Sequence, residues 1–260
     1  MNLPNQFADE PDEDVVLWRF FTPTKFEKLL KDSALWFCRS DRFEDQFEGT
    51  ITANDSISRE TRYRQAFAAN CTNFENFIAT AVAFQEQSVK NARRAYYVSC
   101  WHENAVDSSA MWEKYCPQEP GVAVKTTFGH LKNSLQGQQP MPVMFSRVHY
   151  IDYATESIPR GNSSFVFLYK HTAYKDEREV RAILNYLETI PYENAISPDP
   201  DYPSGLNLTT DLPLLVDALF VRPGTKMSQI TALLSQYGPS LPTPNTSAEA
   251  KPLRLMPGSD

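Results

Sequence analysis

The sequence predicts an α+β fold with a mainly antiparallel sheet. Short runs of β-branched and aromatic residues alternate with amphipathic segments, and several of these runs follow one another without a helix between them. A doubly wound parallel sheet would instead show a regular alternation of strands and helices. With 260 residues, of which 42% are hydrophobic, the chain is long enough to bury a sizeable core.

The predicted strands are short runs rich in Val, Ile, Phe, Tyr and Trp, which fit a buried pleated surface. The first of these runs contains Arg19 as its only charged residue. Strands are expected at residues 15–21, 34–38, 96–101, 121–124, 143–151, 165–169, 178–187 and 215–221.

Two short helices are predicted from apolar residues that recur at i, i+3 and i+4 behind a capping residue. Thr22 caps a helix that runs to about Lys31. Asp107 or Ser108 caps another helix around Trp112.

Domain organisation follows from the remaining patterns. Residues 57–95 are expected to form a helical insert, and one helical face carries Phe74, Phe77, Ile78, Ala81, Val82 and Gln85. The insert belongs to a single domain at residues 15–237, which closes with a helix at 228–237. Residues 1–14 form an acidic leader, and the proline-rich residues 238–260 are expected to be disordered.

The charge balance argues against binding of nucleic acid through bulk positive charge, because the net charge is −7. Much of this charge lies in the leader, whose acids are Asp9, Glu10, Asp12, Glu13 and Asp14. The rest of the chain is therefore nearly neutral, which leaves room for a local basic face.

The sequence predicts a cytoplasmic protein that does not enter a membrane. No apolar run approaches the roughly 18 residues of a membrane helix, and the chain starts with acidic residues where a signal peptide would be basic and then apolar. Cys38, Cys71, Cys100 and Cys116 form no C-x-x-C pair, which indicates reduced thiols and no structural zinc site.

The strand at residues 178–187 carries the strongest candidate for chemistry. Alternation along this strand places Glu177, Glu179 and Arg181 on one face, while Val180 and its i+2 neighbours bury the other. Two carboxylates about 7 Å apart suit a reaction in which one stabilises positive charge and the other orients or deprotonates an acceptor. The alternative is a solvated strand face in which the arginine pairs across the strands.

Arg19 is a second candidate, because a cation inside an apolar strand is costly unless it is paired or reaches a cleft. It would hold a phosphate or carboxylate, or form a buried ion pair with one of the glutamates. Asp45 and Glu48 form a third candidate that would bind a hard cation, hydrogen-bond a ribose or cap the loop. Cys100 and His102 share one strand face and would form a nucleophilic pair in a less favoured reading.

Taken in order, several motifs resemble the domain-of-unknown-function family numbered 2971 over about residues 15–237. The motifs are Leu17-Trp18-Arg19-Phe20, Leu35-Trp36-Phe37, Phe43-x-Asp45-x-x-Glu48-Gly49, Val98-Ser99-Cys100-Trp101, Met111-Trp112-x-x-Tyr115, Gly121-Val122, Lys170 and Asp176-Glu177-x-Glu179-x-Arg181. The chain departs from the family at Glu44-Asp45-Gln46, where Asn-Asp-Pro is usual.

A cation in the first strand, a serine at a later strand and a late E-x-E strand are similar in order to the ADP-ribosyltransferase superfamily. In that superfamily NAD lies in a cleft between two small sheets. The resemblance implies that Arg19 contacts a ribose or phosphate of NAD and Ser99 supports the nicotinamide ribose. It also implies that Glu179 stabilises an oxocarbenium-like transition state and Glu177 orients the acceptor. Ser99 matches only the first serine of the superfamily's Ser-Thr-Ser pattern.

The leading hypothesis is thus an enzyme that cleaves NAD and modifies a protein or nucleic acid, as a bacterial toxin or an anti-phage factor would. Its catalytic candidates are Glu179 and Glu177, and its cofactor-binding candidates are Arg19, Ser99, Asp45, Glu48 and Arg181. One alternative is a nuclease in which Asp45, Glu48 and the two catalytic candidates gather Mg²⁺. Another is a non-catalytic module that binds a nucleotide or a protein partner.

Overall fold

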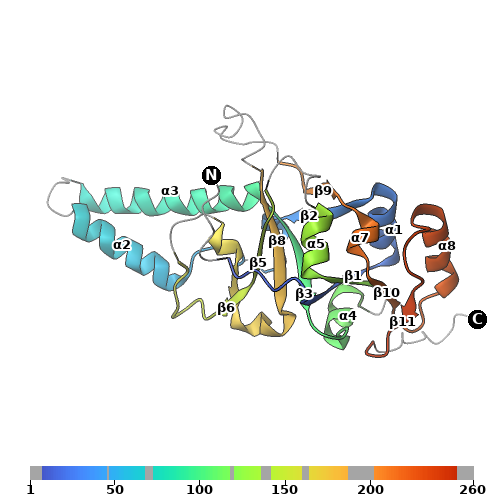
Figure 1. The fold of residues 1–260 in the computed structure, drawn as a ribbon. Helices are drawn as coiled ribbons and strands as arrows, with labels where there is room; N and C mark the ends of the chain where they lie inside the picture. Colours follow the sequence, from blue (N-terminus) through green and yellow to red (C-terminus); the bar gives the residue numbers. More distant parts are fainter. Residues whose placement is uncertain are drawn as a thin grey trace, which may run out of the picture.

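The fold was analysed in a computed structural model that describes residues 8–45, 47–67, 73–117, 120–135, 142–159, 164–186 and 202–250. The structure is a mixed α+β fold with an open, mostly antiparallel sheet, which confirms the predicted class (Figure 1). None of the helices in these ranges combines the length and the apolar character needed to cross a membrane.

The main sheet contains nine of the described strands. They are β1 (Val16–Phe21), β2 (Ala34–Arg39), β3 (Tyr96–Glu103), β4 (Val122–Thr127), β5 (Met144–Arg147), β8 (Glu179–Asn185), β9 (Gly205–Thr209), β10 (Ala218–Val221) and β11 (Asn245–Thr246). Its pairs are antiparallel except for β10 with β11. A separate parallel pair joins β6 (His149–Ile151) and β7 (Tyr169–His171).

The sheet forks at β3. One edge of β3 pairs with β8 along Tyr96–His102, and β1 and β2 share the opposite edge. There β1 pairs at the C-terminal end of β3 and β2 pairs near its N-terminal end. One arm of the fork continues through β4, β10 and β11, and the other continues to β9. The connection between the two arms is helix α1 (Pro23–Asp32).

Alternation along the strands separates two buried faces. On β8, Val180, Ala182 and Leu184 enter the largest apolar core, as predicted, while Ile183 enters a second core on the other face. Four helices cover the larger core: α1, α5 (Phe128–Leu135), α7 (Leu212–Leu215) and α8 (Met227–Tyr237). Helix α4 (Ser109–Tyr115) packs on the opposite face, with Trp112 against Phe20 of β1.

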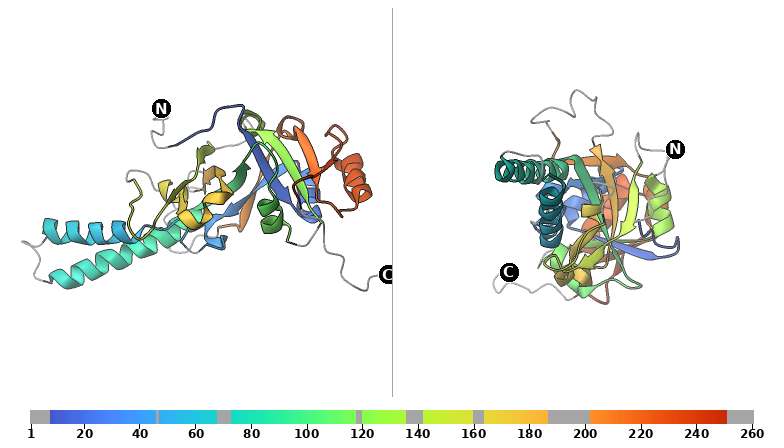
Figure 2. Two further views of the ribbon diagram at one scale, coloured as in Figure 1. Left: turned by 90° about the horizontal axis from the view of Figure 1, so that it is seen from below. Right: turned by 90° about the vertical axis from the view of Figure 1, so that its left-hand side faces the viewer.

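The predicted helical insert is a pair of helices that extends away from the sheet (Figures 1 and 2). It consists of α2 (Ala53–Phe67) and α3 (Phe74–Ala95). Ile78 of the predicted apolar face is buried, whereas Phe77 is 38% exposed and Phe84 is 75% exposed. Next to the body, Ser40 of the short 3₁₀ helix η1 (Ser40–Arg42) donates from Oγ to the carbonyl of Arg93 over 2.6 Å.

Several sequence predictions about local structure are wrong. Residues 143–151 are not one strand, because β5 belongs to the main sheet and β6 to the separate pair, and the strand predicted at 215–221 begins only at Ala218, after α7. Residues 165–169 are not one strand: Phe165–Phe167 form the 3₁₀ helix η2, which places aromatic rings in the second core without requiring a neighbouring strand. The tail is ordered over residues 238–250, because β11 pairs with β10 and Ala250 packs in the core beneath α4. The last ten residues of that tail lie outside the described ranges.

Candidate functional site

Ionised side chains from distant parts of the chain meet in the interior beside β8. Lys170, which is 4% exposed, holds the centre of this charge cluster. Its Nζ lies 2.7 Å from Glu48 Oε1. The same atom lies 2.9 Å from Glu177 Oε2 and 2.9 Å from Glu179 Oε1. The two glutamates named in the sequence prediction therefore share one ammonium group.

Arg181 closes the cluster on the inner side. Its Nε lies 2.6 Å from Glu179 Oε2, and its Nη2 lies 2.9 Å from Glu48 Oε1. The third nitrogen, Nη1, donates to the carbonyl of Phe167 over 2.8 Å. A fully buried guanidinium is thereby satisfied on all of its nitrogens, as the cost of burying a charge requires.

Lys114 of α4 closes the outer side, since its ammonium pairs with Glu177 Oε1 and its side chain is about one-third exposed. The charge cluster therefore contains Glu48, Lys114, Lys170, Glu177, Glu179 and Arg181, with equal numbers of acids and bases. Glu177 is the cluster's acidic group nearest to this exposed lysine.

The predicted strand geometry is wrong for Glu177. It lies in the 3₁₀ helix η3 (Thr172–Glu177), and Arg178 then adopts a left-handed conformation with φ 41°, so that the strand begins at Glu179. The 7 Å spacing expected for one strand face does not apply. The turn brings the carboxylates of Glu177 and Glu179 onto the same lysine instead. The alternative of a solvated strand face is also wrong, because Glu177, Glu179 and Arg181 are buried.

The environment shifts the pKa values of Glu177 and Glu179 in opposite directions. Burial, together with the hydrogen bond to Glu179, raises the pKa of Glu177. Burial also opposes ionisation of Glu179, but the guanidinium of Arg181 and the ammonium of Lys170 outweigh it and hold the pKa of Glu179 well below its usual range. Two adjacent acids with separated pKa values can divide the roles of charge stabiliser and proton carrier.

Arg19 lies at the fork of the sheet. It does not form the buried ion pair with a glutamate that was one of the alternatives predicted from the sequence. Its Nη1 donates to Ser99 Oγ on β3, and its Nη2 donates to the carbonyl of Trp36 on β2 over 2.8 Å. None of the ion pairs among the described residues includes Arg19. Its guanidinium is half-buried and lies 5.4 Å from the Phe21 ring centroid and 5.6 Å from that of Trp101.

The fork explains why Arg19 can reach Ser99. Residues 99–101 of β3 pair with β8 on one edge, while in the described structure no strand pairs with them on the edge where β1 and β2 separate. Arg19 bridges that gap with its hydrogen bonds. The fold thus brings together two residues that the sequence analysis assigned to one ligand.

Cys100 and Tyr115 both feel the charge of Glu179. Burial raises the pKa of the Cys100 thiol, and the carboxylate of Glu179 raises it further. Burial and the carboxylate of Glu179 also raise the pKa of the Tyr115 hydroxyl. Ser99 pairs with Ala182 and Cys100 pairs with Arg181, so the Arg19–Ser99 contact and the charge cluster lie on opposite faces of the sheet. A thiol with a raised pKa is a poor nucleophile, which disfavours the cysteine–histidine reading.

The predicted Asp45 and Glu48 pair is divided by the structure. Asp45 Oδ1 accepts a hydrogen bond from the backbone N–H of Phe47 over 2.9 Å, which is the loop-capping alternative. Glu48 turns into the charge cluster. Gly49 follows with φ 71°, and a Cβ there would lie 2.5 Å from Cε1 of Phe167, so the tight turn after Glu48 requires glycine.

Within the described ranges, no group of three or more His, Cys, Asp or Glu side chains is arranged to hold a metal ion. The ammonium of Lys170 lies between the three glutamates, in the position that a cation would need. The cluster's acids are thus already neutralised by the chain's own bases.

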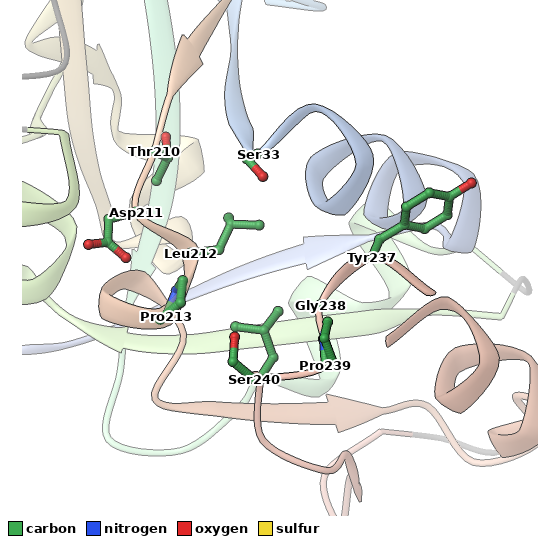
Figure 3. Close-up of a pocket in the computed structure, with 10 residues that line it drawn as sticks. Ser33, Thr210, Asp211, Leu212, Pro213, Tyr237, Gly238, Pro239 and Ser240 are labelled. Carbon is green, nitrogen blue, oxygen red and sulfur yellow. The ribbon is translucent and has the colours of Figure 1, made fainter. Parts of the chain in front are cut away.

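A surface pocket of about 250 Å³ lies elsewhere, between the end of α8 and the start of α7 (Figure 3). Its one acid, Asp211, accepts a hydrogen bond from the N–H of Leu214 and caps α7. This pocket contains none of the candidate site residues. The pocket therefore lies apart from both the charge cluster and the sheet fork.

Comparisons with protein-family models, curated proteins and solved structures give no match. The resemblances drawn from the sequence motifs stay predictions.

Sequence reasoning missed the roles of Lys170 and Lys114. In the sequence analysis Lys170 appears only within a family motif. It follows the aromatic run Phe165–Tyr169, so, like Arg19, it is a cation in an apolar segment that needs an acidic partner when buried. Lys114 carries no comparable signal, because a lysine on a short amphipathic helix is ordinarily solvated.

Proposed function

We propose that the protein cleaves the glycosidic bond of NAD and transfers ADP-ribose to an acceptor. The proposal is supported by the contact of Arg19 with Ser99 at the fork of the sheet, together with the pair of carboxyl groups with separated pKa values on the other face of β3 and β8. A cation without an acidic partner among the described residues is available to a phosphate or ribose oxygen.

In the proposed reaction, the bond between the ribose C1′ and the nicotinamide nitrogen breaks, and nicotinamide leaves with the bonding electrons. Glu179, held ionised by Arg181, stabilises the positive charge that develops on the ribose. The acceptor's lone pair then forms a new bond to C1′. The proton that the acceptor loses is taken up by the carboxylate of Glu177, whose raised pKa suits this role.

A second candidate function is a binding module for NAD or another nucleotide without turnover. The observation that favours it is that both oxygens of Glu179 are engaged, one by Lys170 and the other by Arg181. A carboxylate held in this way serves the fold even if no substrate reaches it. Both candidates use Arg19 and Ser99 to hold the ligand, and they differ in whether Glu179 acts on it.

The position of Lys170 argues against the magnesium-dependent nuclease. A divalent cation would have to displace the ammonium and would then share the acids with Arg181. Heat stability that rises with Mg²⁺ would reverse this judgement.

The proposal is tested by nicotinamide release from NAD in the presence of a cell lysate. Wild-type protein is compared with Glu179→Gln and with Glu103→Gln, a matched control that removes a β3 carboxylate paired with Arg147 outside the cluster. Release by the wild type and the control but not by Glu179→Gln supports the transferase. NAD binding without release by any of the proteins supports the binding module, and neither binding nor release contradicts both.

Arg19→Ala separates ligand binding from folding, because Arg19 makes two hydrogen bonds to the described residues and lies half-buried. Binding of NAD should weaken at least about tenfold when one charge-assisted contact is lost. Circular dichroism and the melting temperature establish that each variant is folded before its activity is compared.

A further inference from the structure

His102 is a buried histidine with one satisfied and one unsatisfied ring nitrogen. It lies on β3, opposite Glu179 of β8 and Trp18 of β1, and it is 5% exposed. Its Nδ1 is 2.7 Å from the backbone carbonyl oxygen of Glu177. Its Nε2 is buried without a hydrogen-bond partner among the described residues.

The partner of Nδ1 fixes the tautomer of His102. A carbonyl oxygen only accepts hydrogen bonds, so Nδ1 must carry the proton and Nε2 must carry the lone pair when the ring is neutral. Protonation would place a second N–H in a buried position with no acceptor among the described residues. The geometry therefore favours neutral His102 as a donor to Glu177.

This hydrogen bond anchors the turn that carries Glu177. The turn leaves the sheet before β8 begins, so the pairing of β3 with β8 does not reach it. Two contacts tie it to the end of β3: the His102 side chain to the carbonyl of Glu177, and the N–H of Glu103 to the carbonyl of Arg178 over 2.9 Å. Only the first of these contacts acts on Glu177 itself.

We propose that His102 is the positioning residue that holds Glu177 in place for the acceptor. The inference rests on the proposed transferase function, in which Glu177 takes the acceptor's proton while Glu179 acts on the ribose. His102 touches neither ligand. It sets the direction from which the Glu177 carboxyl group reaches Glu179 and Lys170, and it thereby controls transfer to the acceptor more than cleavage of NAD.

The contacts around Glu177 leave this role to His102. Lys114 and Lys170 bind the carboxylate oxygens of Glu177, whereas His102 binds its backbone carbonyl and so acts on the turn itself. The charged groups that act on His102 itself are Arg178, Glu103 and Glu179. An apolar side chain at position 102 would fill the same space, but it would leave the carbonyl of Glu177 without its donor.

A pair of amide variants tests the proposal. In His102→Asn the side-chain N–H₂ group occupies about the position of Nδ1 and can still donate to Glu177, whereas in His102→Gln it extends to about the position of Nε2. The first readout is the ratio of ADP-ribosyl transfer to nicotinamide release. We expect this ratio to stay within about twofold of wild type for Asn and to fall at least about tenfold for Gln, because a small displacement of an acid–base group is costly.

A second readout does not depend on enzyme activity. The carboxyl carbon of Glu177, assigned with the Glu177→Gln variant in ¹³C-glutamate-labelled protein, is titrated by NMR. The titration of Glu177 should shift in His102→Gln and stay unchanged in His102→Asn. His130→Gln serves as the control, because His130 of α5 pairs with Asp217 and lies outside the charge cluster.

The two readouts separate the possible failures. If the wild type releases no nicotinamide, the transferase proposal fails, and the NMR titration alone decides the role of His102. If Asn and Gln behave alike in both readouts, the positioning role is overturned. If His102→Gln does not fold, His102→Met provides the comparison, since it also lacks a donor but is compatible with an apolar environment.

Discussion

Replacing Lys170 with methionine tests whether the charge cluster is as tightly coupled as its geometry implies. The substitution removes the ammonium that contacts Glu48, Glu177 and Glu179 and keeps a side chain of similar length. Breaking a buried ion pair costs about 3–5 kcal/mol. Each carboxylate keeps one other cation in the variant, so the lower end of that range, about 3 kcal/mol, is the expected loss of unfolding free energy.

The assay is urea unfolding at pH 7, followed by the fluorescence of the buried tryptophans. The control is Lys28→Met, because Lys28 pairs with Asp32 on the exposed surface of α1 with 54% of its side chain accessible. Exposed pairs contribute about 0–1 kcal/mol. The double variant Lys170→Met, Glu177→Gln restores the charge balance and should recover at least about 1 kcal/mol.

The pH dependence of Lys170→Met follows from Glu177. Losing the ammonium raises the pKa of this acid further above its unfolded value, so the acid favours the folded state more as the pH falls. The difference from wild type should therefore shrink between pH 7 and about 5. A loss below about 1 kcal/mol at pH 7, or a double variant no more stable than the single one, would refute the account of a desolvated and mutually compensated cluster.

Further predictions concern the turn, the histidine and the thiols. Gly49→Ala should lower the unfolding free energy by about 1–3 kcal/mol in urea, because of its positive φ and the contact with Phe167; an unchanged midpoint would contradict that geometry. Burial lowers the pKa of His102, so its contribution to stability is complete above about pH 6.5 and declines as the pH falls towards its folded value. Wild type should accordingly lose more stability than His102→Asn between pH 7 and about 5 in urea titrations, and parallel curves would argue against a neutral buried ring. Cys100 and Cys116 should resist iodoacetamide in native protein and react in urea, as followed by peptide mass spectrometry; rapid labelling of native Cys100 would contradict its raised pKa.

Local periodicity was sufficient to predict much of the fold. Alternation placed Val180, Ala182 and Leu184 in the core, and helical spacing located the insert. It was insufficient at Glu177, because a single left-handed residue, Arg178, ends the alternation and no sequence pattern requires that conformation at an arginine. The failure changed the predicted geometry of the site but left Glu177 and Glu179 together on Lys170.

The site's long-range contacts were beyond the reach of local patterns. Glu48, Lys170 and Arg181 meet across more than a hundred residues of chain, and their pairing depends on how the 3₁₀ helix η2 and the loop before α2 pack on β8. The meeting of Arg19 with Ser99 likewise depends on the fork at β3, which arises from strand pairing and not from composition. The sequence identified these residues as chemically unusual, and the tertiary structure supplied their partners.

The segment that leads into α2 meets the end of α3 at the body, since a Cβ at Gly49 would lie 3.1 Å from Cγ of Arg93. Helix α3 ends against η1, where Ser40 binds the carbonyl of Arg93, and the chain continues directly into β3. An insertion whose two ends are neighbours behaves as an exchangeable module, because its length can change by whole helical turns without moving the strands. The helical pair can therefore become longer or shorter while Glu48, Arg19 and β3 keep their places.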